Sequence, residues 1–293
     1  MRFGKGHGTG NDFILLPDRH DESPLSAELV RALCERHTGL GADGVIRFVP
    51  SGDPAAPWFM DHWNFDGSTA LMCGNGLRLL AWYLVHLGWA PPGRQQVLTR
   101  SGVRWAEVSD DGSSDVRTSD GRVTIDMGPV RFPAGGNGEL RVQPSDSQHW
   151  YRATAVDVGN PHAVVWLSEL AAAGALERPP TVSPAGAFPD GVNIEFAIQP
   201  ETGGAAAIMR VFERGVGETQ SCGTGACAVA ADLVRRTGLV PETPIVVDVL
   251  GGRLELQEGS DGRWAMTGPV TLIAEGDVNL AAVGPLPVHA VAL

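Results

Sequence analysis

Two segments of this 293-residue chain place a cysteine directly before a glycine-containing turn. Cys73 stands in the sequence Met-Cys-Gly-Asn-Gly-Leu-Arg, and Cys222 stands in the similar sequence Ser-Cys-Gly-Thr-Gly-Ala-Cys. An apolar stretch with helical periodicity follows each of them. A cysteine just before a helix lies near unpaired backbone N–H groups and the positive end of the helix dipole, which favour a thiolate. Because the same N–H groups can bind a carboxylate, each segment is a candidate catalytic half-site.

The recurrence of this cysteine-plus-helix unit indicates an internal repeat with a period near half the chain. If two repeated lobes place one sulfur on each face of a substrate carbon, one thiolate can remove the Cα proton while the opposite thiol delivers a proton to the other face. N–H groups from both helix ends would stabilise the enolate-like charge. The repeat therefore predicts inversion of an amino-acid stereocentre by Cys73 and Cys222.

The simplest alternative for any one cysteine is a buried thiol with no chemical role. Cys34 lies beside the apolar stripe of a helix, and Cys227 lies on the helix that follows Cys222, so core packing is expected for both. The spacing Cys222-x4-Cys227 is not that of a structural zinc site. We therefore expect no bound metal and only two reactive cysteines.

Composition narrows the class of ligand. The formal net charge of −12 and the pI near 5.0 argue against a nucleic acid or an anionic membrane surface as partner. The longest strongly apolar run, Leu79 to Val85, is too short to span a bilayer. Lys5 is the only lysine and lies in a glycine-rich segment, so a pyridoxal-phosphate Schiff base is not expected. These features predict a cytoplasmic protein that acts on a small molecule without pyridoxal phosphate.

The elements around the cysteines predict an α+β fold of two lobes. Helices are expected from Gly76 to near Gly88 and from Ala226 to near Gly238, each apolar on most sides and therefore buried. Short segments with strand-like composition occur in both halves. Many short strands around one buried helix in each half predict a lobe of residues 1–122, which carries Cys73, and a lobe of residues 123–293, which carries Cys222.

Several motif blocks of this chain resemble the diaminopimelate epimerase family, and the resemblance extends over most of the sequence. The blocks are Lys-Gly-His-Gly-Thr-Gly-Asn-Asp-Phe from Lys5, Asn-Phe-Asp-Gly-Ser-Thr-Ala-Leu-Met-Cys-Gly-Asn-Gly-Leu-Arg from Asn64, Gly-Asn-Pro-His from Gly159, Asn-Ile-Glu-Phe from Asn193, and Glu-Arg-Gly-Val-Gly-Glu-Thr-Gln-Ser-Cys-Gly-Thr-Gly from Glu213. Their order and spacing make the resemblance specific.

The resemblance implies a fold and an activity. It implies two pseudo-symmetric lobes, each a barrel-like sheet of mainly antiparallel strands around a central helix. The C-terminal segment, roughly its last 20 residues, would pack back on the first lobe. It also implies reversible conversion of LL- to meso-diaminopimelate, in lysine and peptidoglycan-precursor biosynthesis, without metal or organic cofactor.

The resemblance also assigns roles to individual residues. Cys73 and Cys222 would be the acid/base pair, and His162 and Glu213 would adjust the pKa values of the two thiols. The residues implied to hold the substrate are Asn11, Asn64, Gly74, Asn75, Asn160, Asn193, Glu213, Arg214, Gly223 and Thr224. Their chemistry suits an ammonium group and two carboxylates, since amides donate and accept and a guanidinium binds a carboxylate with two hydrogen bonds.

The chain departs from the family pattern at one position and leaves other activities open. Gly44 stands where many members have a glutamine in the substrate site, so this contact is expected to be absent or made by backbone. Proline racemase and hydroxyproline epimerase also use two thiols, but their first motif carries histidine after Cys-Gly, where this chain has Asn75. A histidine racemase, a non-catalytic binding relative and a homodimer remain open alternatives.

Overall fold

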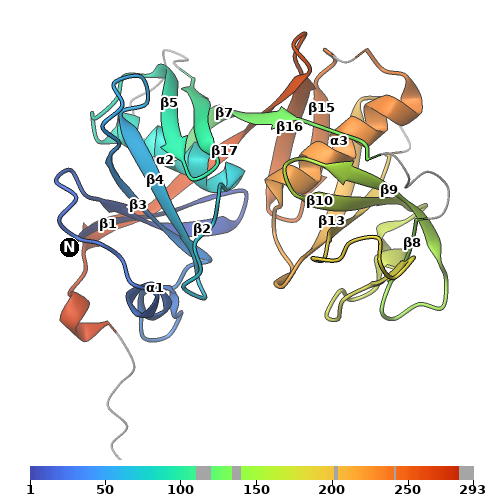
Figure 1. The fold of residues 1–293 in the computed structure, drawn as a ribbon, viewed down its shortest axis with the longest axis horizontal. Coiled ribbons are helices and arrows are strands. Elements are labelled where there is room, and N and C mark those ends of the chain that lie inside the picture. Colours follow the sequence, from blue (N-terminus) through green and yellow to red (C-terminus); the bar gives the residue numbers. More distant parts are fainter. Residues whose placement is uncertain (110–119, 134–139, 201–203, 241, 284–293) are drawn as a thin grey trace, which may run out of the picture. The chain divides into compact units, whose positions relative to one another are not determined.

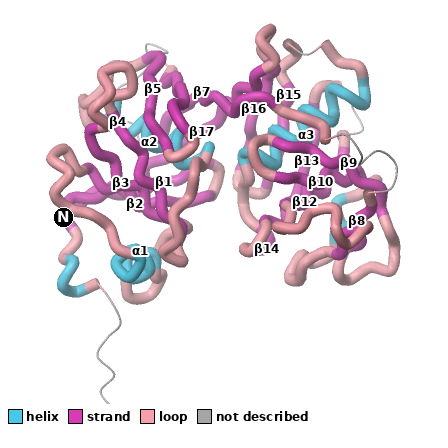
Figure 2. The backbone as a smooth tube through the Cα atoms, viewed as in Figure 1, coloured by secondary structure: helices cyan, strands magenta, loops and turns pink. Residues whose placement is uncertain are grey.

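The computed structural model describes residues 1–109, 120–133, 140–200, 204–240 and 242–283. It is a strand-rich α+β fold with few helices, which confirms the predicted class (Figures 1 and 2). The chain forms two compact units: the first comprises Met1–Val123 and the chain from Val270 onward, and the second comprises Thr124–Pro269. Two strands contain these boundaries, β7 (Asp120–Pro129) and β17 (Arg263–Asp277). The chain therefore returns to the first unit within β17; residues 284–293 lie outside the described part.

The first unit is a ring of strands. Its strands are β1 (Arg2–Gly8), β2 (Asn11–Pro17), β3 (Gly44–Pro50), β4 (Trp58–Asn64), β5 (Gly93–Thr99) and β6 (Gly102–Val108), together with parts of β7 and β17. Successive pairs from β1 to β6 are antiparallel, parallel, antiparallel, parallel and antiparallel. The Ser109 N–H donates to the Arg122 carbonyl beyond β6, β7 pairs with β17, and β17 pairs with β1. These links close the sheet on itself.

The second unit repeats the same order of pairings. Its main strands are β9 (Tyr151–Asp157), β10 (Pro161–Trp166), β12 (Asn193–Ile198), β13 (Ala206–Glu213), β15 (Ile245–Val249) and β16 (Gly252–Glu258). Successive pairs are again antiparallel, parallel, antiparallel, parallel and antiparallel. The short elements β8 (Arg141–Gln143), η1 (Leu170–Ala173), β11 (Thr181–Ser183) and β14 (Gly217–Glu218) are additions to this pattern. The repeat predicted from the two cysteine segments is thus present in the strand pairing.

Each unit contains one buried helix that packs against its strands. In the first unit this is α2 (Gly74–His86), which contacts β1, β2 and β6. In the second unit it is α3 (Gly223–Thr237), which contacts β9, β10, β12, β13, β15 and β16 (Figure 1). Both helices begin earlier than expected, because the glycines after each cysteine already belong to the first helical turn. As a result Cys73 and Cys222 are the N-cap residues.

Two shorter helical elements, α1 (Ala27–Cys34) and η2 (Leu280–Ala282), lie in the first unit. Helix α1 begins after Ser26, whose hydroxyl accepts the Leu29 N–H at 3.2 Å, and η2 follows β17. Cys34 and Cys227 are 5% and 0% exposed, which confirms that both pack in a core. Among the described residues, no helix has the length and apolar character needed to cross a membrane.

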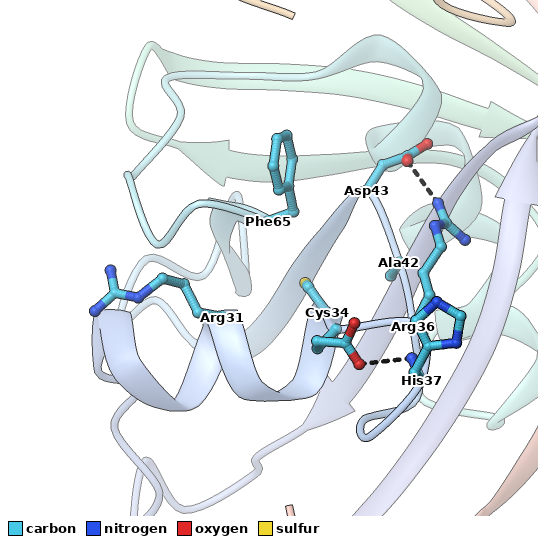
Figure 3. Close-up of a pocket in the computed structure, with 8 residues that line it drawn as sticks. Arg31, Cys34, Arg36, His37, Ala42, Asp43 and Phe65 are labelled. Carbon is cyan, nitrogen blue, oxygen red and sulfur yellow. Dashed lines mark hydrogen bonds and ion pairs between the residues drawn. The ribbon is translucent and has the colours of Figure 1, made fainter. Parts of the chain in front are cut away.

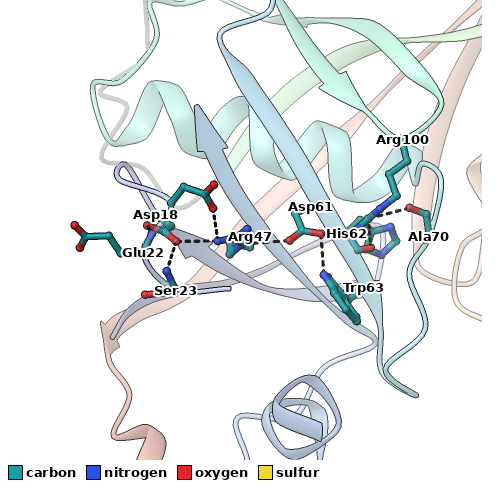
Figure 4. Close-up of polar contacts among 10 residues, drawn as sticks. Asp18, Glu22, Ser23, Arg47, Asp61, His62, Trp63, Ala70 and Arg100 are labelled. Carbon is teal, nitrogen blue, oxygen red and sulfur yellow. Dashed lines mark hydrogen bonds and ion pairs between the residues drawn. The ribbon is translucent and has the colours of Figure 1, made fainter. Parts of the chain in front are cut away.

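A buried cluster of charges fixes β3 against β4 and the loop after β2 (Figure 4). Arg47 on β3 donates from Nε to Asp61 Oδ2 at 3.2 Å and from Nη1 to Asp18 and Asp21 at 3.0 and 2.8 Å. Asp61 on β4 also accepts hydrogen bonds from Trp63 and Arg100. Since β4 ends at Asn64, this cluster helps to set the position of a predicted substrate-binding residue.

Candidate active site

The first half-site is built around Cys73. Its Sγ lies 3.6 Å from Asn11 Oδ1, and Asn75 Nδ2 donates to the same oxygen at 3.4 Å. Asn11 Nδ2 donates to Asp43 Oδ2 at 3.0 Å, so the amide group of Asn11 is oriented with its carbonyl oxygen toward the thiol. The structure therefore brings together Cys73, Asn11, Asn75 and the intervening Gly74, four residues that the sequence assigned to one site.

Arg78 lies beneath this half-site and was not assigned a role from the sequence. Its side chain is fully buried, and Nη2 donates to Asn75 Oδ1 at 2.6 Å and to Thr9 Oγ1 at 3.3 Å. Burial lowers the pKa of Arg78 to about 10, and interaction with Cys73 opposes that effect, so the guanidinium remains charged at neutral pH. An arginine in an otherwise apolar buried helix was the signal that could have identified it.

The second half-site is built around Cys222, which is 6% exposed. Its Sγ accepts the Gly225 N–H at 3.4 Å and lies 3.4 Å from Thr224 Oγ1. Asn160 Nδ2 donates to Thr224 Oγ1 at 3.4 Å, and Asn160 Oδ1 lies 2.9 Å from His162 Nε2. The predicted residues Cys222, Gly223, Thr224, Asn160 and His162 therefore form one connected group.

Burial decides the proton affinity of Cys222. It raises the pKa of this thiol well above the ordinary value of 9.0, and the charges of Glu213 and Glu195 raise it further. Hydrogen bonds from Thr224 and Gly225 act in the opposite direction but are smaller. The helix N-terminus acts in the expected direction, since the Gly225 N–H lowers the pKa of Cys222, but desolvation is the larger effect. Cys222 is a protonated thiol at neutral pH.

The other predicted residues of the second unit lie at the ends of β12 and β13. The Glu213 carboxylate accepts the Thr219 hydroxyl at 2.5 Å. Asn193 Oδ1 accepts the Arg214 backbone N–H at 3.0 Å, and Asn193 Nδ2 donates to the Pro161 carbonyl at 3.3 Å. Arg214 Nη1 donates to the Asp190 carbonyl at 2.8 Å. These bonds fix the turn after β13 next to the start of β12.

Asn64 and Gly44 lie opposite each other in the β3–β4 pair. The Asn64 side chain donates to Ser68 Oγ at 3.0 Å, within the turn that follows β4. A Cβ atom added at Gly44 would lie 2.6 Å from the Trp63 carbonyl oxygen, closer than real Cβ contacts allow. Gly44 thus permits a close approach of the two strands. At this spacing a glutamine side chain would not fit at position 44.

A pocket of about 530 Å³ in the first unit adjoins the Cys73 half-site through Asp43 (Figure 3). It is lined by Arg31, Cys34, Glu35, Arg36, His37, Ala42, Asp43 and Phe65. Asp43 accepts a hydrogen bond from Arg36 on one side and from Asn11 on the other. Burial raises the pKa of Cys34 to about 12, so the cysteine in this pocket is a thiol without acid/base function.

Sequence comparisons identify the family. The family model described as diaminopimelate epimerase matches residues 3–133 and 154–273. The chain is 44% identical over 294 residues to diaminopimelate epimerase from Streptomyces coelicolor, covering 96% of each chain. It is 40% identical to diaminopimelate epimerase from Thermobifida fusca, covering 97% of this chain and 100% of the other.

Solved structures show the same fold at lower identity. A hydroxyproline epimerase from Agrobacterium vitis has a TM-score of 0.69 at 17% identity, covering 98% of this chain and 94% of the other. A methylitaconate-delta-isomerase has a TM-score of 0.59 at 16% identity, covering 99% and 98%. The fold is therefore shared by isomerases of different substrates, whereas the full-length similarity at higher identity is specific. With a cysteine at the head of the buried helix in each of its repeated units, the chain belongs to the diaminopimelate epimerase family.

Proposed function

We propose that this chain interconverts LL- and meso-diaminopimelate with Cys73 and Cys222 as the two acid/base groups. The observation that carries the proposal is the repeated placement of a cysteine at the N-cap of the buried helix. Cys73 lies beside the Asn11 amide, and Cys222 is connected to the Asn160 amide through Thr224. The 44% identity to a diaminopimelate epimerase supports the choice of substrate. The reaction so described needs neither metal nor organic cofactor.

In the proposed mechanism, the protonation state of Cys222 determines which cysteine accepts a proton first and which donates one. Because burial and two carboxylates keep Cys222 protonated, it supplies the proton in the direction in which Cys73 acts as base. The substrate would contact both half-sites at once, with one sulfur on each face of its Cα. In the reverse direction the two thiols exchange roles, since the same proton transfers run backward.

The proposed substrate contacts follow from the donors and acceptors in each half-site. Backbone N–H groups of Gly74, Asn75, Gly223 and Thr224, at the two helix starts, would hold the carboxylate at the reacting carbon. Amides of Asn11, Asn64, Asn160 and Asn193 and the Glu213 carboxylate would hold polar groups of the substrate, including its ammonium groups. Arg214 would bind the distant carboxylate by exchanging its contact with the Asp190 carbonyl.

The proposal also covers where the enzyme works in the cell and what it binds. Because the proposed substrate belongs to a biosynthetic pathway, we expect a cytoplasmic enzyme. The net charge of −12 favours a small-molecule ligand over nucleic acid or a membrane surface. A homodimer is compatible with these properties, and analytical ultracentrifugation would measure the oligomeric state in solution.

The proposal is tested by an activity panel on the purified chain. LL-diaminopimelate, proline, hydroxyproline and histidine are each incubated in deuterated buffer, and inversion and Cα deuterium are followed by chiral chromatography and NMR. Only diaminopimelate should be inverted, because the contacts described suit a substrate with two amino-acid ends. Inversion of one of the other amino acids, with diaminopimelate unchanged, would contradict the proposed substrate.

A further prediction concerns the distance between the two thiols. Two sulfurs that flank one carbon can approach closely when the substrate is absent, so mild oxidation should join Cys73 and Cys222 in a disulfide. Activity should disappear and return after addition of a reductant. Peptide mapping by mass spectrometry identifies the bond; an oxidised, inactive sample in which both cysteines carry free thiols would show that they do not meet.

A further inference from the structure

Glu195 on β12 and His162 on β10 form a buried polar pair in the second unit. Both side chains are fully buried, and His162 Nδ1 lies 2.6 Å from Glu195 Oε1. In the described part of the chain, Glu195 Oε2 is buried without a hydrogen-bond partner. Burying a carboxylate with one unbonded oxygen lowers the stability of the fold, so its presence here calls for an explanation beyond packing.

Hydrogen bonds connect this pair to Cys222. His162 Nε2 lies 2.9 Å from Asn160 Oδ1, Asn160 Nδ2 donates to Thr224 Oγ1, and Thr224 Oγ1 lies 3.4 Å from the Cys222 sulfur. Because the Asn160 amide nitrogen faces Thr224, its oxygen faces His162, and His162 Nε2 must carry a hydrogen. His162 Nδ1 and Glu195 then share one further proton.

Glu195 also lies directly against the turn that carries the thiol. A Cβ atom added at Gly225 would lie 2.7 Å from Glu195 Oε1. Gly225 is the residue whose backbone N–H donates to the Cys222 sulfur. The Glu195 carboxylate therefore contacts the N-terminal turn of α3. His162 is connected to the Cys222 thiol through Asn160 and Thr224.

The repeat provides an internal comparison. Gly76 stands three residues after Cys73, as Gly225 does after Cys222, and Phe13 stands two residues after Asn11, as His162 does after Asn160. A Cβ atom added at Gly76 would lie 2.7 Å from Ile46 Cδ1 and 3.4 Å from the Phe13 ring.

The strand registers confirm this correspondence. Gly44 pairs with Phe13, and Asn193 pairs with His162, so Ile46 and Glu195 hold the same position two residues further along their strands. The place occupied by His162 and Glu195 beneath α3 is thus occupied by Phe13 and Ile46 beneath α2. The two half-sites share backbone geometry, but only the second has a polar pair at this position.

We propose that Glu195 is a positioning residue of the reaction, which holds His162 and, through it, sets Asn160 and Thr224 at Cys222 and makes the two half-sites chemically unequal. This inference rests on the two-thiol function proposed above. Because the buried pair of His162 and Glu195 beneath Cys222 has no polar counterpart beneath Cys73, the two thiols can hold different numbers of protons before substrate binds. A reaction that needs one thiol and one thiolate requires such a difference.

The charged groups that face Cys222 define the expected pH effect. They are Glu195 from β12 and Glu213 from β13, and His162 from β10 acts through the hydrogen-bonded chain. Both carboxylates raise the pKa of Cys222, and the proton shared by His162 and Glu195 offsets part of the Glu195 effect, so Glu195→Gln should lower this pKa by less than the loss of a full charge would.

The test compares Glu195→Gln with the wild-type enzyme. Its kcat should fall on the order of 10- to 100-fold with little change in KM, because positioning rather than binding is lost. The pH dependence of kcat should also move. Without substrate, NMR titration of protein labelled with ¹³C at cysteine Cβ should show the Cys222 transition at lower pH. Glu195→Asp, which keeps a carboxylate, should restore part of the activity.

Two further variants keep the test decisive. Ile46→Leu, at the matching position of the first unit, should leave kcat and the Cys222 titration near wild type. The double variant His162→Phe, Glu195→Ile places the apolar pair of the first unit beneath α3, so it should fold even where Glu195→Gln does not, and should show the same losses. Unchanged kcat and an unchanged Cys222 titration in a folded variant would overturn the proposal, even if its melting temperature fell. Wild-type protein that does not invert diaminopimelate would instead refute the proposed function.

Discussion

Replacing either Cys73 or Cys222 with alanine is expected to reduce inversion of diaminopimelate by about a thousandfold or more in both directions. Each direction needs one sulfur to remove the Cα proton and the other to supply one, so neither cysteine can be spared. A variant that keeps one sulfur can still exchange the proton on its own face. Residual deuterium exchange without inversion should therefore be limited to one stereoisomer in each variant, and the stereoisomer should differ between the two.

Proton NMR in deuterated buffer measures exchange, and chiral chromatography measures inversion. The matched control is Cys34→Ala: this cysteine lies in the first unit, is 5% exposed and has its pKa raised to about 12 by burial. It should retain wild-type rates. Near wild-type inversion in Cys73→Ala or Cys222→Ala would refute the two-thiol mechanism, and exchange of both stereoisomers by one variant would indicate a different base.

Replacing Arg47 with alanine is expected to lower the free energy of unfolding by about 3–5 kcal/mol. Arg47 is the shared partner of Asp18, Asp21 and Asp61, and the carboxylates of Asp18 and Asp61 are 9% and 8% exposed. Without the guanidinium these two charges stay buried with fewer partners, which is the costly way to break a buried ion pair. Urea unfolding followed by circular dichroism measures the change.

The control is Arg253→Ala, which removes an ion pair to Asp248 from a side chain that is 66% exposed. Its effect should stay below about 1 kcal/mol, because exposed pairs are well solvated in either state. If Arg47→Ala were no more destabilising than Arg253→Ala, the buried cluster would not be holding β3 and β4 together.

The same cluster predicts how the effect depends on pH. Burial raises the pKa of Asp18, but N–H groups of Ser23 and Glu22 and the Arg47 guanidinium outweigh it, so the folded pKa lies below 3.8. A depressed carboxyl pKa stabilises the fold above the unfolded value and loses that contribution as pH falls through the folded value. The difference between wild type and Arg47→Ala should therefore shrink from neutral pH toward about pH 3. A difference that grew in acid would contradict this sign.

Local sequence features identified Cys73 and Cys222 as the candidate acid/base pair and located the helices that follow them. Cys-Gly-x-Gly followed by an apolar helical stretch is a pattern of neighbouring residues, and its repetition revealed two units before any contact was known. The helix starts were misplaced by two or three residues because glycine can either precede a helix or form its first turn. The asparagines proposed to bind substrate were selected from motif blocks, since an isolated asparagine is more often a turn residue.

Contacts between distant residues could not be predicted in this way. The orientation of Asn11 depends on Asp43, that of Asn75 on Arg78, and that of Asn160 on His162 and Glu195. No periodicity in the sequence connects these partners, because they meet only when the strands pair in their observed register. The passage of β7 and β17 through both units likewise depends on pairings that span most of the chain.

The sequence alone determined that the chain has two thiols at the heads of two buried helices, because helix starts and apolar periodicity are local properties. The tertiary structure decided what surrounds each of those thiols. The helix dipole acts equally on both and was visible in the sequence, but the proton affinity of Cys222 is controlled by desolvation and by carboxylates from β12 and β13. Burial and charge proximity are properties of the packed fold, so Glu195 beneath one helix and Ile46 beneath the other became distinguishable only there.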